Sequence, residues 1–311
     1  MGNPVVVSDS KMAIEWVKDS KGIDQVVLRN PEGASAKVSL QGGQVISWRS
    51  ARGDEHLFTS SKVVKAPKEN RGGIAICFPQ FSNCGSLEQQ GFARNKLWIV
   101  DEAPPPLPAK SSDGSPFIDL LLKPSEEDLK SWHPSYELRL RVCLGLNGNL
   151  TLTSRVWNIN GKPFSFSFAY HSYLAVSDIS EVRIEGLETM DYLDSLCNKE
   201  RFTEQGNAIT FEAEFDRVYL GSPNPVAVID HERRRTYVIR REGLSDVVVW
   251  NPWDKKAKAM PDMGYDEYRR MVCVGGAVVA NPITLKPGQQ WKSCLEITAA
   301  ASSFCSEGLS F

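Results

Sequence analysis

The feature that most limits what this chain can fold into is a strict alternation of apolar and polar side chains over residues 136–144, YELRLRVCL. A period of two places successive side chains on opposite faces of a β-strand. Residues 150–156 repeat the pattern after an Asn-Gly pair, which is typical of a tight hairpin turn. A third run, residues 164–174, follows a second Asn-Gly pair and places its aromatic side chains on one face. We therefore predict three consecutive antiparallel strands, joined as a meander.

The rest of the chain shows the same kind of local pattern. Short apolar runs with nearby glycine turns occur at residues 25–29, 36–40, 44–48, 236–240, 247–250 and 283–297. They predict an all-β fold, a large antiparallel β-sandwich. Residues 125–130 are the clearest helical segment, because a serine precedes acidic residues of a first turn. Strand patterns flank the proline-rich residues 104–108, so we predict one domain over residues 1–311, with a weakly ordered tail at 301–311.

Composition excludes several classes of protein. A net charge of −2 argues against a nucleic-acid partner or an acidic membrane surface, and no apolar segment approaches membrane-spanning length. The seven cysteines lack CxxC or Cys/His ligand spacing, which favours reduced thiols over disulfides or a zinc site. We expect a cytoplasmic monomer that uses no metal and no cofactor.

Residues 71–98 are dense in polar residues that packing alone does not explain. Arg71 precedes Gly72 and Gly73, and Arg94 follows a second glycine at Gly91. Two guanidiniums on loops between short strands can form a bidentate clamp for a carboxylate or a phosphate. The alternative, that both arginines are solvated loop residues, stays open on the sequence alone.

Two motifs in this stretch resemble a known family. The segments RGGIAICFPQF at 71–81 and GSLEQQGFARN at 85–95 are similar to those of the glucose-6-phosphate 1-epimerases, or hexose-6-phosphate mutarotases, of the aldose 1-epimerase superfamily. The likeness runs from Gly22 to Gly288 and is strongest to plant, apospory-associated protein C-like members. It implies a galactose mutarotase-like supersandwich fold and a hexose 6-phosphate substrate, most of all glucose 6-phosphate.

His171 is the first candidate for chemistry. The alternation puts it on a strand face otherwise made of small residues, which leaves room for a ligand, although a purely structural histidine fits the same pattern. The resemblance implies that His171, within AYHSYL, is the general acid. Interconverting the α- and β-anomers requires an acid to protonate the ring oxygen while a base takes the proton of the C1 hydroxyl.

The resemblance also implies substrate-binding roles for several other residues. Arg71 and Arg94 suit the phosphate, and Asp216, within EFDRVY, suits the sugar hydroxyls. Gln44 is a weaker candidate, as is Trp250, which fits a core position equally well. Gln90 stands where relatives carry a histidine; it can hydrogen-bond a hydroxyl but cannot carry a proton charge.

Gly275 is the more serious departure from the family pattern. It occupies the position of the family's acidic general base and has no side chain to remove a proton. Three acids just upstream could substitute for it: Asp262, Asp266 and Glu267. Each can equally well be interpreted as a solvated loop acid. We therefore predict a weakened mutarotase, with a non-catalytic sugar-phosphate-binding protein as the alternative. A third reading, an interaction module that binds no sugar, fits poorly with the retained arginines and His171.

Overall fold

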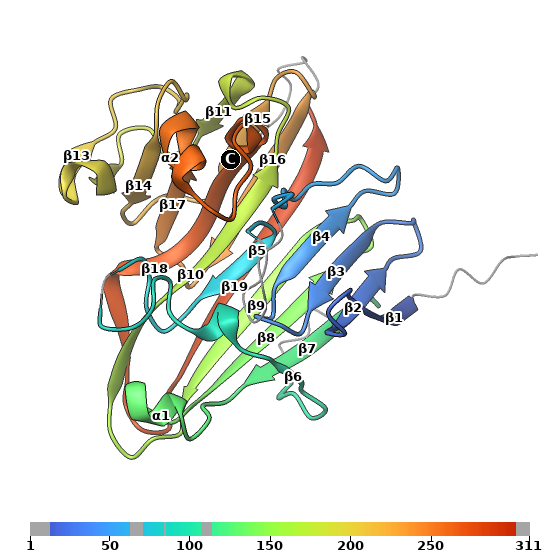
Figure 1. Cartoon of the computed structure of the whole chain (residues 1–311), viewed down its shortest axis with the longest axis vertical. Coiled ribbons are helices and arrows are strands. Elements are labelled where there is room, and N and C mark those ends of the chain that lie inside the picture. Colours follow the sequence, from blue (N-terminus) through green and yellow to red (C-terminus); the bar gives the residue numbers. More distant parts are fainter. Residues whose placement is uncertain (1–12, 63–70, 84, 107–113, 303–311) are drawn as a thin grey trace, which may run out of the picture.

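Two large antiparallel sheets make up the fold (Figure 1). The structure, a computed structural model, describes residues 13–62, 71–83, 85–106 and 114–302. Within them, the sheets have eleven and eight strands, so the predicted all-β sandwich is confirmed.

The eleven-stranded sheet has the spatial order β1 (Ala13–Lys18), β2 (Asp24–Arg29), β3 (Ser35–Ser39), β4 (Val45–Arg49), β5 (Ile74–Cys77), β10 (Phe164–Ala175), β18 (Met271–Leu285), β17 (Asp246–Asn251), β14 (Phe215–Tyr219), β12 (Asp191–Asp194) and β13 (Glu200–Thr203). The eight-stranded sheet has the order β11 (Val182–Glu185), β15 (Val226–Asp230), β16 (Arg235–Glu242), β19 (Gln290–Ala301), β9 (Leu150–Asn158), β8 (Tyr136–Leu144), β7 (Phe117–Leu122) and β6 (Ile99–Val100).

Helices are few and short in the described residues. They are α1 (Asp128–Ser131), α2 (Trp253–Ala259) and the 3₁₀ segments η1 (Ala93–Asn95), η3 (Ile179–Glu181), η4 (Ser195–Cys197) and η5 (Glu267–Arg270). The predicted helix at 125–130 begins later than expected, because Ser125 lies outside it and its hydroxyl accepts a hydrogen bond from the Asp128 N–H at 3.2 Å. The sequence analysis did not predict α2, which follows Pro252 and carries Asp254 in its first turn.

The predicted meander is wrong for its third strand. β8 pairs with β9 from Tyr136 to Leu144, but the second neighbour of β9 is β19. β10 instead crosses to the other sheet and lies between β5 and β18. The reason is that both faces of β10 are largely buried, so a position within the large sheet suits it better than the end of a hairpin ladder.

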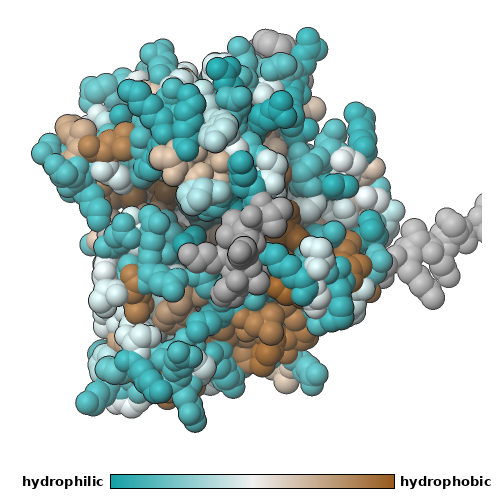
Figure 2. All heavy atoms as spheres, viewed as in Figure 1, coloured by the Kyte–Doolittle hydropathy of each residue, from teal (hydrophilic) through white to brown (hydrophobic). Residues whose placement is uncertain are grey.

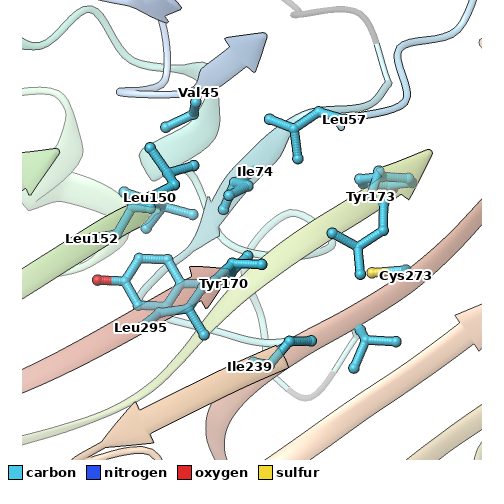
Figure 3. Close-up of a cluster of buried hydrophobic side chains, with 14 of the residues drawn as sticks. Val45, Leu57, Ile74, Leu150, Leu152, Tyr170, Tyr173, Ile239, Cys273 and Leu295 are labelled. Atoms are coloured by element: carbon cyan, nitrogen blue, oxygen red, sulfur yellow. The ribbon is translucent and has the colours of Figure 1, made fainter. Parts of the chain in front are cut away.

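The main core lies between the sheets. Figure 3 shows Tyr170 of β10 pointing toward Leu150 and Leu152 of β9 and Leu295 of β19. Its hydroxyl donates a hydrogen bond to the Ser154 Oγ across the sheets, at 2.6 Å. Because side chains alternate along a strand, His171 faces the opposite side of the large sheet, away from this core.

The described chain ends with the last strand of the eight-stranded sheet. Ala301 is the last residue of β19 and pairs with Arg235, and the Ser302 N–H donates to the Arg234 carbonyl. The rest of the predicted tail, 303–311, lies outside the described residues.

Three further features concern the cysteines, the length of the helices and the surface. No two of the described cysteines form a disulfide with each other; they are Cys77, Cys143, Cys197, Cys273 and Cys294. Among the described residues, no helix has the length and apolar character needed to cross a membrane. Hydrophilic residues cover most of the face shown in Figure 2, with hydrophobic residues gathered below its centre.

Candidate active site

A pocket of about 470 Å³ lies on the face of the eleven-stranded sheet that carries His171. Side chains from β5, β10, β17 and β14 form its floor, and loops and α2 form its walls. It brings together most of the residues singled out in the sequence: Gln44, Arg71, Gln90, Arg94, His171, Asp216 and Trp250. Gly275 is not among the lining residues.

His171 occupies the centre of this floor. It pairs in register with Ala75 of β5, and its ring lies 4.8 Å from Tyr173 and 5.8 Å from Trp250, between ring centroids. Burial, together with the positive charges of Arg71 and Arg94, lowers the pKa of His171 to about 3. The imidazole is therefore neutral at neutral pH in these surroundings.

Two glycines set the position of Arg71. Gly72 and Gly73 have φ values of +139° and +60°, and a Cβ on Gly73 would lie 2.1 Å from the Val45 carbonyl oxygen. Only glycine allows the chain to pass this close to β4 and enter β5. Arg71 then reaches the pocket, where Nη1 donates to the Tyr173 hydroxyl at 2.9 Å and Nη2 contacts the Asp262 carboxylate at 2.8 Å.

Arg94, on η1, differs from Arg71 in its partners. Its Nη2 donates to the Gln89 carbonyl at 3.1 Å, and no carboxylate in the described part of the chain pairs with it. The Nε atoms of both Arg71 and Arg94 are buried and have no hydrogen-bond partner among the described residues. Because buried donors are normally satisfied, guanidinium N–H groups in a pocket that lack an acceptor among the described residues point to an anionic ligand.

The two glutamines hold the loops beside the arginines. Gln44 Nε2 donates to the Gly72 carbonyl at 2.6 Å, and Gln90 Oε1 accepts from the Ser82 N–H at 2.9 Å. Both also line the pocket. Each side chain therefore fixes loop geometry, and its remaining hydrogen-bonding atom is the one that can face a ligand.

Asp216 lies at the far end of the pocket floor, on β14. It pairs in register with Trp250, and its carboxylate is 4.0 Å from the Lys256 ammonium. Burial raises the pKa of Asp216, although Ser195 and Lys256 act in the opposite direction. The sequence analysis missed Lys256 because it missed α2, and it missed Tyr173, which lies two residues after His171 and thus on the same face.

Gly275 lies in β18, next to His171. The pairs Ala169 with Ala277 and Tyr173 with Cys273 define the register, so Gly275 is opposite His171. A Cβ on Gly275 would lie 1.7 Å from the Tyr170 carbonyl oxygen. The backbone accepts only glycine at this position, because the Tyr170 carbonyl of β10 fills the space that a side chain on β18 would need.

The three acids named as possible substitutes are in different surroundings. Asp262 lines the pocket, whereas Asp266 does not. The Glu267 carboxylate accepts hydrogen bonds from Ser60 Oγ, the Ser61 N–H and the Gly264 N–H, at 2.6 to 2.7 Å. Glu267 therefore stabilises loops.

Three groups of polar side chains line the pocket. Arg71 and Arg94 place two cationic side chains near His171, which supplies a proton carrier, and Asp216 with Lys256 makes the β14 side of the floor polar. The floor between them includes apolar side chains such as Val248. No group of three or more potential metal ligands occurs among residues 13–62, 71–83, 85–106 and 114–302. The pocket can thus hold an anion beside the arginines and exchange protons at His171.

Comparison with known proteins gives one consistent result. Residues 24–298 match the family model described as aldose 1-epimerase. A protein of Cenchrus ciliaris named "Putative glucose-6-phosphate 1-epimerase" is 58% identical over 295 residues, which cover 94% of this chain and 89% of that protein. A protein of the same name from Salmonella typhimurium is 30% identical over 256 residues, 81% of this chain and 82% of that protein.

Solved structures agree with the fold. The crystal structure of a mutarotase-named protein from Salmonella typhimurium ("putative mutarotase (YeaD)") superposes with a TM-score of 0.80 at 25% identity, covering 93% of this chain and 97% of that one. A galactose mutarotase-like protein from Clostridium acetobutylicum has a TM-score of 0.73 at 15% identity, covering 94% and 100%. The galactose mutarotase-like fold expected from the sequence is confirmed.

Proposed function

The chain belongs to the aldose 1-epimerase family and is an isomerase of that kind, and on this premise we propose that it interconverts the α- and β-anomers of glucose 6-phosphate. The observation that carries the choice of a phosphorylated sugar is the presence of two cationic side chains, Arg71 and Arg94, in the lining of the pocket. Arg94 has no carboxylate partner among the described residues, and both Nε atoms are buried without partners. A phosphate dianion supplies charged acceptors, which bind guanidinium groups more strongly than the neutral hydroxyls of a sugar do.

Phosphate binding also bears on the acid. Burial is the largest cause of the low pKa of His171, and the charges of Arg71 and Arg94 add to it. A dianion bound beside the arginines offsets their charges and moves the pKa of His171 back upward, while the effect of burial continues to act. The phosphate that selects the substrate thereby also favours the protonated form of the acid.

One observation favours the alternative of a non-catalytic sugar-phosphate-binding protein. Gly275 offers no carboxylate next to His171, and the backbone leaves no room for one. Loss of one member of an acid–base pair slows a reaction about 10²- to 10⁴-fold, while binding survives. The two functions therefore differ in turnover and share the same ligand.

The deciding experiment follows freshly dissolved α-glucose 6-phosphate to anomeric equilibrium by polarimetry, with and without the protein. The spontaneous rate is subtracted, and binding is measured in parallel by calorimetry. Acceleration above the spontaneous rate supports the mutarotase. Binding without acceleration supports the binding protein, and no binding of glucose 6-phosphate contradicts both.

A monomeric, cytoplasmic protein remains part of the proposal. Both statements rest on the sequence, in which the thiols show no disulfide or metal spacing. Light scattering after size-exclusion chromatography tests the first, and fractionation of cells that express the protein tests the second.

A further inference from the structure

The proposed reaction needs a base, and the pocket offers few candidates. Among the described lining residues the only carboxylates are Asp216 and Asp262. Asp266 does not line the pocket, and the Glu267 carboxylate already accepts three hydrogen bonds from the loops around it.

Asp262 is poorly placed to accept a proton. Its carboxylate lies 2.8 Å from Arg71 Nη2, and both side chains are largely buried, with 28% and 19% of their surfaces exposed. The Asp262 carboxylate is thus already engaged in a close ion pair, which it would have to give up to reach a sugar hydroxyl.

The Asp216 carboxylate lies farther from its cationic neighbour than the Asp262 carboxylate lies from Arg71. Lys256 is 4.0 Å from Asp216 but only 2.6 Å from Glu214, so its closer partner is the other carboxylate. Burial raises the pKa of Asp216, and the negative charges of Glu214 and Asp194 act in the same direction. The Ser195 hydroxyl and Lys256 oppose these effects without cancelling them. A buried carboxylate with a raised pKa accepts a proton more readily than a carboxylate in a close ion pair.

The sheet also places Asp216 on the side of the pocket away from the acid. His171 is on β10 and Asp216 on β14, with β18 and β17 between them. Along the register Asp216 is level with Tyr173, because it pairs with Trp250, Trp250 with Cys273 and Cys273 with Tyr173. Three strand spacings of about 4.8 Å and a two-residue offset put the His171 and Asp216 backbones about 16 Å apart, and the sugar would lie in the space between the two side chains. Trp250 lies on the floor of this space, paired with Asp216 and 5.8 Å from the His171 ring.

We propose that Asp216 is the general base of this chain and performs the step for which Gly275 has no side chain. The inference rests on the proposed function. The Asp216 carboxylate takes the proton of the C1 hydroxyl, and the electron pair of that O–H bond forms the C1 carbonyl. The bond from C1 to the ring oxygen breaks, and the ring oxygen keeps its electron pair and takes a proton from protonated His171. After rotation at C1 the same steps run backward and both protons return.

The test compares Asp216→Asn with wild type and with Asp266→Asn, a matched change just outside the pocket. Asparagine keeps the volume and most hydrogen bonds of Asp216 but takes no proton at neutral pH. We expect kcat to fall about 10²- to 10⁴-fold, with a much smaller change in the Kd for glucose 6-phosphate. The Asp266→Asn protein should match wild type. Formate should partly restore the rate of Asp216→Ala, because it supplies a carboxylate to the vacated space.

Different failures have different meanings. An Asp216→Asn protein that keeps its kcat and loses only affinity would show that Asp216 binds hydroxyls and is not the base. The same would follow if Asp262→Asn lost the activity in its place. In both cases the wild-type protein still accelerates mutarotation and the proposed function stands. A wild-type protein that gives no acceleration at all overturns the catalytic function and the base together.

Discussion

Replacing Arg94 by methionine removes a charge from the lining of the pocket while keeping a long apolar side chain. In the described residues no carboxylate pairs with Arg94, so the change leaves no orphaned acid behind. A hydrogen bond to a charged group contributes about 1.5 to 3 kcal/mol. Since about 1.4 kcal/mol is a factor of ten in affinity, the Kd for glucose 6-phosphate should rise about 10- to 150-fold. The affinity for free glucose should change much less, because glucose lacks the phosphate that we assign to Arg94.

Titration calorimetry with both sugars measures the two affinities. Arg240→Met is the control, because Arg240 lies on the eight-stranded sheet, 56% of its side chain is exposed, and its contact with Glu296 is 3.9 Å long. An exposed pair of this kind contributes little to stability. Equal weakening for glucose and glucose 6-phosphate would refute an anion-binding role for Arg94, as would a Kd for glucose 6-phosphate that stays at the wild-type value.

Two further predictions concern the histidines. His171→Gln should abolish the acceleration seen by polarimetry while glucose 6-phosphate still binds, since glutamine donates a hydrogen bond but cannot carry a proton charge; retained acceleration would exclude His171 as the acid. His56 is buried against Trp48 and Tyr237, and burial lowers its pKa to about 4. The unfolded chain, where a histidine has a pKa of about 6.5, takes up a proton first, so folding stability should fall as the pH drops from about 6.5 to 4. Urea unfolding at several pH values should show a smaller fall in the free energy of unfolding for His56→Phe than for wild type. An equal fall in the two proteins would contradict the assignment of this pH dependence to His56.

The local pattern predicts faces of strands better than it predicts their neighbours. The period of two in residues 164–174 correctly places Tyr170 in the core and His171 on the other face. It could not predict that β10 lies between β5 and β18, because alternation along one strand contains no information about which strand pairs with it. That choice depends on burying both faces of β10 at once.

The same limit applies to predicting the candidate site from the sequence. Arg71, Arg94, His171 and Asp216 could be selected from the sequence with the help of family motifs, and the structure brings them into one pocket. The roles of the nearby acids could not be separated, because Asp262 and Glu267 look alike as residues of one polar loop. Their difference comes from long-range partners, Arg71 for one and Ser60 for the other. Lys256 was missed because a seven-residue helix gives too short a periodic signal.

Restoring a carboxylate at Gly275 is the obvious way to test whether this position once carried the base, and the structure predicts that it fails. The first added atom, Cβ, would lie 1.7 Å from the Tyr170 carbonyl oxygen, which is backbone and cannot rotate away. β18 would have to separate from β10, and forced overpacking of this kind costs about 1 to 3 kcal/mol or more. We expect Gly275→Glu and Gly275→Ala to lose similar stability in urea, because the clash comes from Cβ, and neither should gain activity. A stable Gly275→Glu protein with faster mutarotation would mean that β18 moves easily and that a carboxylate at residue 275 can reach C1.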